Sequence, residues 1–270
     1  YQRLGELAPF AVSAAMSLLL VAIFWLLRLS DKPGIVAPSE RPRRGPARSI
    51  GRFVAQPRLR LAWTLVFMRS SWWVFFFIYV PVYAVQHGLG EIAGAMVVSA
   101  GNALLFVAPL AGSLARRIGV RGVLRVGYFV CGGFTLAAGL FFDLPAAVIT
   151  LLLLASVGTV CLDAVGNVPF LAAVRSRERE EMTTVFRTYL DAAELLPPAI
   201  FALVLSFAEL KAVFLIQGGA MLAVLALLQY LPASLGKTRI LLRPEGPLPG
   251  STAPAAAPDT AAGTLSKPAP

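Results

Sequence analysis

Long apolar runs, separated by short polar or basic segments, make up most of the chain. At ~1.5 Å of rise per residue, an apolar helix of ~20 residues crosses the ~30 Å hydrocarbon core of a bilayer. Runs of this length occur at residues 8–27, 61–85, 92–115, 123–142, 145–170, 185–208 and 212–231. The pattern therefore predicts an all-α integral membrane protein with seven transmembrane helices.

Two polar regions define the domain organisation. Residues 30–60 are rich in Pro, Gly, Ser and Arg and predict a basic cytoplasmic linker. Residues 233–270 are rich in Pro, Ala, Gly, Ser and Thr and predict a disordered cytoplasmic tail. The first helix (1–29) is thus separated by the linker from a six-helix bundle at 61–232.

The linker contains one apolar pattern of its own. Ile50, Phe53 and Val54 are spaced to form one side of a short helix flanked by arginine. Such a helix lies at a membrane surface and is attracted to anionic headgroups. The alternative is a disordered linker whose arginines only fix the topology.

Composition agrees with a membrane protein and excludes several soluble classes. Apolar residues make up 57% of the chain and charged residues 14%, and the mean hydropathy is +0.74. The net charge of +10 comes from basic residues in loops rather than along one face, so we expect no nucleic-acid partner. Cys131 and Cys161 lie inside apolar runs without CxxC or Cys/His spacing, so we expect no metal and no cofactor.

Basic loops orient the predicted helices. The loop after the third span holds four arginines: Arg116, Arg117, Arg121 and Arg125. Residues 86–91, on the opposite side, contain no Lys or Arg. Because basic loops stay in the cytoplasm, the pattern predicts an outside N-terminus and a cytoplasmic C-terminus in the cell (inner or plasma) membrane. The last six spans then form two triplets of opposite orientation, which is the inverted-topology repeat common in secondary transporters.

The arginine-rich loop resembles a known motif. Residues 112–121, reading GSLARRIGVR, resemble the G-x-L-A-D-R-x-G-x-R/K motif of the major facilitator superfamily, found between the second and third helices of each six-helix half. The matching positions are Gly112, Leu114, Ala115, Arg117, Gly119 and Arg121, while Arg116 stands where the family usually has Asp.

This resemblance implies the C-terminal half of a transporter that works by alternating access. Residues 8–27 would be its sixth helix and residues 30–60 its central loop. The chain would be a fragment that lacks five earlier helices, and the N-terminal half of the same transporter would be its partner. The leading helix of each triplet would line the central cavity, and the second helix would pack against the other half.

Four charged residues stand inside the apolar spans and away from their ends: Arg69, Asp163, Asp191 and Glu194. A charge at the centre of a membrane helix costs ~2.5–3.5 kcal/mol on insertion scales, so it usually faces a cavity or a partner. We interpret Arg69 as a group that binds an anionic or polar part of the substrate, and one of the three carboxylates as a group that exchanges a proton. The alternative is a static set of ion pairs, Arg69 with Asp163 and Arg187 with Asp191.

Prolines and small residues predict interruptions in three spans. These residues are Pro81 in the span 61–85, Gly166, Asn167 and Pro169 in the span 145–170, and Pro197 and Pro198 in the span 185–208. Broken helices form gates or binding sites in transporters. A kink that only improves packing is the alternative.

Motifs for catalysis are missing from the sequence. His87 is the single histidine and lies in a short loop, and neither GxSxG nor a Walker-type phosphate loop is present. We therefore predict a permease rather than an enzyme, which moves a small solute across a lipid bilayer with protons as the coupling ion. A seven-helix membrane receptor or sensor is the alternative.

Overall fold

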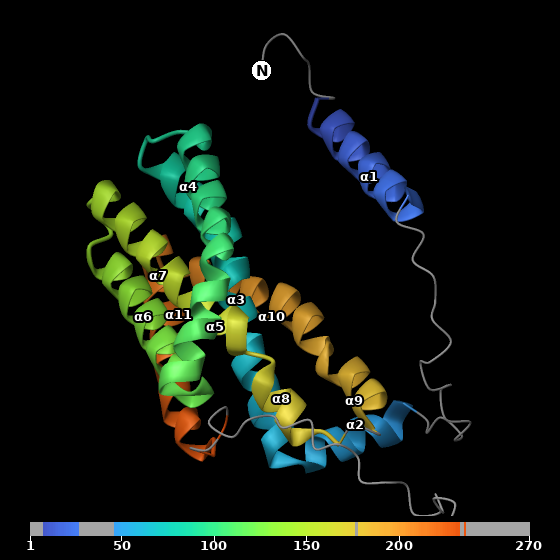
Figure 1. Ribbon diagram of the computed structural model, residues 1–270. Helices are drawn as coiled ribbons and strands as arrows, with labels where there is room; N and C mark the ends of the chain where they lie inside the picture. The colour runs from blue at the N-terminus through green and yellow to red at the C-terminus, as the bar shows by residue number, and fades with distance from the viewer. Residues whose placement is uncertain (1–7, 27–45, 176–177, 233–234, 236–270) are drawn as a thin grey trace, which may run out of the picture. The chain divides into compact units, whose positions relative to one another are not determined.

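The computed structural model describes residues 8–26, 46–175, 178–232 and 235 (Figure 1). Every regular element in these ranges is helical, which confirms the predicted all-α fold. The chain divides into two units, Tyr1–Arg44 and Gly45–Pro270. Most of the predicted tail and the first part of the predicted linker lie outside the described residues.

The first unit contains one described helix, α1 (Ala8–Leu26). Its 19 residues extend over ~28 Å and coincide with the first predicted span. Phe10, Leu18 and Trp25 are all exposed within this unit. A helix that is apolar on every side needs lipid or other helices around it.

The described residues of the second unit form six helical segments that are long and apolar enough to cross a membrane. They are α3 (Pro57–Gln86); α4 (Glu91–Ala103) with η1 (Leu104–Val107) and α5 (Ala108–Ile118); α6 (Val120–Leu140); α7 (Pro145–Val165) with α8 (Val168–Ala173); α9 (Arg179–Phe186) with α10 (Thr188–Leu205); and α11 (Leu210–Leu227) with η3 (Leu228–Tyr230). With α1, these segments of the described chain account for the seven predicted helices.

Two of the segments begin earlier than hydropathy predicts. α3 begins at Pro57, because proline fits the first helical turn and Gln56 before it is extended. α9 begins at Arg179, where Glu180 and Glu181 in the first turn favour a helix N-terminus. Both first turns are polar, so the hydropathy pattern does not include them in the predicted spans.

A further helix, α2 (Pro46–Ala55), lies within the predicted linker. Phe53 is 3% exposed and packs in a cluster with residues of α3, α8 and α9. Ile50 and Val54 are about half exposed. The apolar side chains of α2 are therefore divided between the bundle and its surroundings.

Helix α6 packs closely against α7 on one side and α11 on the other. Glycines allow both contacts. A Cβ on Gly127 of α6 would lie 2.6 Å from Leu162 of α7, and a Cβ on Gly218 of α11 would lie 2.5 Å from the backbone nitrogen of Leu136. Small residues at such crossings let membrane helices approach to backbone contact.

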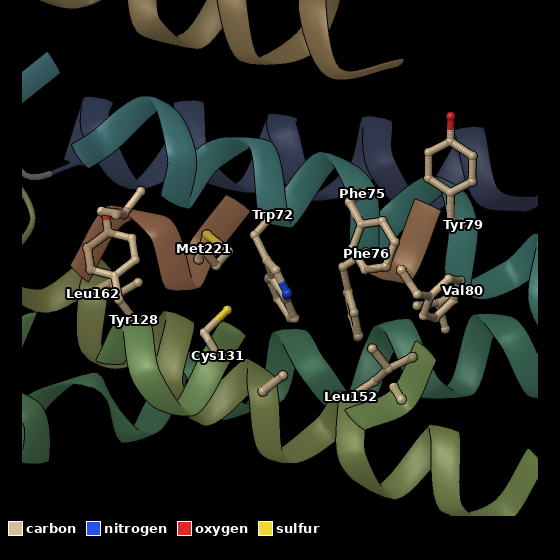
Figure 2. Close-up of a cluster of buried hydrophobic side chains, with 14 of the residues drawn as sticks. Trp72, Phe75, Phe76, Tyr79, Val80, Tyr128, Cys131, Leu152, Leu162 and Met221 are labelled. Carbon is tan, nitrogen blue, oxygen red and sulfur yellow. The ribbon is translucent and has the colours of Figure 1, made fainter. Parts of the chain in front are cut away.

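Helix α3 brings an aromatic core to this group (Figure 2). Trp72, Phe75 and Phe76 are fully buried, and they point from α3 towards the helices that surround it. The Trp72 indole donates a hydrogen bond of 2.8 Å to Thr135 Oγ1 of α6. Because the one polar atom of Trp72 has a partner, its burial leaves no unpaired donor.

Two of the three spans lack the interruptions predicted at their prolines. α3 is continuous through Pro81, and α10 is continuous through Pro197 and Pro198. Membrane helices tolerate proline where neighbouring groups satisfy the freed carbonyls. The predicted breaks at these prolines are therefore wrong. The span 185–208 is broken at Arg187, between α9 and α10, and the span 92–115, where no break is predicted, is interrupted by η1.

Candidate functional site

Arg69 of α3 and Asp163 of α7 form an ion pair between two helices. Arg69 Nε lies 3.1 Å from Asp163 Oδ1, and the side chains are 10% and 23% exposed. Arg69 is the thirteenth residue of α3, ~18 Å from the start of that helix. The pair is therefore well inside the membrane-spanning part of the bundle, with an accessible edge on the carboxylate.

Three further side chains surround the pair. The Trp73 indole donates a hydrogen bond of 2.9 Å to Asp163 Oδ2, and Arg69 Nη2 donates one of 3.2 Å to Ser70 Oγ. Arg69 Cζ lies 5.8 Å from the centre of the Tyr189 ring of α10. Opposite charge, hydrogen bonds and a ring face together stabilise the two charges away from water.

The backbone beside the pair is interrupted. α7 ends at Val165, α8 begins at Val168, and Gly166 and Asn167 form the turn between them. The ring of Pro169 is incompatible with a helical hydrogen bond to the carbonyl of Val165, four residues earlier. A Cβ on Gly166 would lie 2.7 Å from the Leu162 carbonyl oxygen and 3.4 Å from Arg69 Nη1. A glycine here leaves room for the guanidinium.

Asp191 and Glu194 do not join this pair. Both lie on the exposed side of α10, and Arg187 stands outside the helix, at the break between α9 and α10. Within the described residues, Arg187 and Asp191 form no ion pair. The structure thus brings together Arg69 and Asp163 and leaves Asp191 and Glu194 facing outward.

The arginine-rich loop is a tight connection between α5 and α6. Gly119 has a φ of 79°, a conformation that residues with a Cβ rarely adopt. Leu114 packs against the core, Arg117 is exposed, and Arg121 Nη2 donates a hydrogen bond of 3.3 Å to the backbone carbonyl of Gln229. A Cβ on Gly112 would meet nothing within 4 Å, so the two glycines differ in their structural role.

Sequence reasoning missed Trp73 and Tyr189 as neighbours of the pair. Trp73 follows Arg69 by four residues, so helical periodicity placed both on one face of α3. Tyr189 belongs to another helix, and no spacing in the sequence links it to Arg69. Only the packing of α10 against α3 shows that contact.

Six membrane-length helices, with an ion pair between two of them, define a multi-pass membrane protein. The sequence model of the family described as the Major Facilitator Superfamily matches residues 2–188. The chain therefore belongs to the Major Facilitator Superfamily and is a membrane transporter for a small-molecule substrate. No curated protein and no solved structure shows significant similarity to the chain. Members of this family are in general transporters rather than enzymes or receptors.

Proposed function

We propose that the chain is part of a secondary active transporter that moves a small solute by alternating access and couples this movement to protons. The observation that carries the proposal is the ion pair between Arg69 and Asp163 inside the bundle. Alternating access would come from movement of this bundle against an N-terminal half made of the preceding helices.

The pair supplies two functions that proton-coupled binding requires. While Asp163 is ionised, its carboxylate neutralises Arg69. When a proton binds Asp163, the guanidinium loses its counter-charge and attracts an anionic group of the solute, because an unpaired charge at membrane depth is costly. Loss of the proton restores the ion pair and favours release of the solute. Proton and solute are thereby linked through one arginine.

The surroundings of the pair support exchange over a static role. The Asp163 side chain is 23% exposed, so a proton and a solute can reach it. The turn at Gly166 and Asn167 lies within one helical turn of Asp163, and broken helices form binding sites and gates in transporters. A purely structural ion pair needs neither feature.

The exposed sides of two helices support a partner half. Asp191 and Glu194 of α10 and Asn102 of α4 are exposed in this unit. Polar groups at membrane depth face protein or water rather than lipid. We therefore infer that the N-terminal half of the transporter covers α4 and α10.

The arginines indicate which end of the bundle faces the cytoplasm. The loop between α5 and α6 and the helix α2 lie at the same end of the bundle (Figure 1). Arg116, Arg117, Arg121 and Arg125 flank the turn between α5 and α6, and α2 carries Arg48 and Arg52. This excess of arginine favours the cytoplasm for that end. We propose that the transporter lies in the cell membrane with this end inside, with the start of the described chain outside and its end in the cytoplasm.

Uptake by the full-length protein in proteoliposomes tests the proposal. A panel of small organic anions is offered with and without an imposed pH gradient. We expect Arg69→Gln to abolish uptake of the anion that wild type accumulates, because the solute loses its counter-charge. Arg187→Gln removes an exposed arginine outside the pair and should retain uptake. Equal uptake by wild type and Arg69→Gln would contradict the proposal.

A further inference from the structure

A second polar site lies at the α2 end of the bundle, apart from the pair between Arg69 and Asp163. A pocket of about 580 Å³ opens between the end of α2, the first turn of α3, the end of α8 and the segment that leads into α9. Arg52, Gln56, Arg58, Arg175 and Glu178 supply its polar lining. Its volume falls within the ~300–1,000 Å³ of typical ligand sites.

The charge in this pocket is predominantly positive. Three arginines line it against one carboxylate. Arg52 Nη2 lies 2.7 Å from Glu178 Oε1, and Glu178, through this hydrogen bond and its charge, raises the pKa of Arg52. Arg52 therefore stays charged at every physiological pH. Arg58 and Arg175 are exposed and have no ion-pair partner among the described residues.

One buried donor in the pocket is left without an acceptor. Arg52 Nη1 is buried and lacks a hydrogen-bond partner in the part of the chain that the structure describes. The start of α3 adds little to this, because Pro57 has no N–H and the N–H groups of Leu59 and Arg60 donate to the Gln56 carbonyl at 3.0 and 3.2 Å. The guanidinium groups are therefore the anion-binding groups of the pocket, and phosphate oxygens match their geometry.

The position of the pocket indicates that its phosphate ligand belongs to a lipid headgroup. It lies beside the first turn of α3, a membrane-length helix. On α2, Ile50 and Val54 are 50% and 52% exposed, one turn or less from Arg52. An exposed apolar side next to a basic group is typical of a helix in the headgroup layer. Basic pockets at the cytoplasmic ends of membrane helices bind anionic headgroups.

We propose that this pocket binds the phosphate of an anionic phospholipid headgroup, with Arg52, Arg58 and Arg175 as its ligands and α2 lying in the headgroup layer. Bound lipid joins α2 to the first turn of α3 and to Arg175, just after α8. This role is separate from solute binding, and it stands or falls independently of the transport mechanism.

Lipid titration of the full-length protein in neutral detergent tests this site. Phosphatidylglycerol and phosphatidylcholine with identical acyl chains are added separately, and bound lipid is counted by native mass spectrometry. The double variant Arg58→Gln with Arg175→Gln should bind phosphatidylglycerol about 25-fold more weakly, at about fivefold per arginine. The matched control, Arg116→Gln with Arg125→Gln, removes two exposed arginines outside the pocket and should bind like wild type.

Two further arms make the outcome decisive. Replacing both Arg58 and Arg175 by Lys keeps the charge and should retain binding within about fivefold of wild type, which separates loss of charge from misfolding. Inorganic phosphate alone should displace little phosphatidylglycerol. If the glutamine variant binds phosphatidylglycerol as tightly as wild type, the site is wrong. If inorganic phosphate competes as well as the lipid, the pocket is a site for free phosphate and the headgroup proposal is overturned.

Discussion

Gly158 of α7 and Gly127 of α6 meet at their backbones. A Cβ on Gly158 would lie 2.9 Å from the Gly127 carbonyl oxygen and 2.7 Å from the backbone nitrogen of Cys131. Asp163 stands on α7 five residues beyond this crossing. The contact between α6 and α7 therefore helps to fix the helix that carries the carboxylate of the candidate site.

Enlarging this crossing should destabilise the bundle. We expect Gly158→Val to lower the stability by about 1–3 kcal/mol, because the two helices must separate to admit the side chain. Thermal unfolding in detergent measures the effect. The control is Gly133→Ala in α6, where a Cβ meets nothing within 4 Å. Equal melting temperatures for the two variants would show that the crossing is looser than the structure indicates.

Removing one partner of the ion pair should cost more than removing both. Arg69→Gln or Asp163→Asn alone leaves an uncompensated charge, and we expect a loss of about 3 kcal/mol, at the low end for a buried pair because Asp163 is partly exposed. The double variant should lose less than either single variant, because it leaves no unpaired charge. A double-mutant cycle from unfolding in detergent measures the coupling. Strictly additive losses would mean that the two side chains do not interact.

Two glycines of the arginine-rich motif, Gly119 between α5 and α6 and Gly112 inside α5, should respond differently to alanine. Gly119 has a φ of 79° and a ψ of 159°, a conformation found almost only in glycine, so Gly119→Ala should cost about 1–3 kcal/mol through backbone strain. Gly112 lies inside α5 with open space beside it, and Gly112→Ala should be neutral or slightly stabilising. Melting temperatures of the two variants provide the comparison. A larger loss at Gly112 would contradict the loop geometry.

Filling the space beside Arg69 should reduce transport. In Gly166→Ala, the added methyl group would meet the Leu162 carbonyl oxygen and Arg69 Nη1, which displaces the guanidinium or the turn. We expect lower uptake in proteoliposomes with the protein still folded. Gly219→Ala, whose Cβ meets nothing within 4 Å, is the control. Uptake by Gly166→Ala equal to that of the control would show that the space beside Arg69 is not needed for transport.

Hydropathy was sufficient to predict the helices, because the length and apolarity of a run are local properties. It also placed Arg69 and Asp163 inside their spans, and an ion pair between them was one of the two readings that the sequence allowed. The Tyr189 ring beside Arg69 depends on the packing of α10 against α3, which no spacing in the sequence encodes.

The positions of the helix breaks also depend on packing, which the sequence alone does not show. Pro169 marks a real interruption because its ring conflicts with the Val165 carbonyl. Pro81 and Pro197 lie in continuous helices, since tolerance of proline depends on the groups packed around each carbonyl. Helix α2 also depends on packing that the sequence does not show, because its Phe53 is buried by residues from α3, α8 and α9.

Comparing two transport modes in Asp163→Asn tests the central claim most directly. Asparagine resembles the protonated carboxyl and cannot exchange a proton. In proteoliposomes, the variant should therefore retain exchange of solute across the membrane at equal pH, but lose accumulation driven by a pH gradient. Asp143→Asn, in the turn between α6 and α7 where the side chain is exposed, should keep both activities. Gradient-driven accumulation by Asp163→Asn at the wild-type level would contradict the assignment of Asp163 as the coupling group.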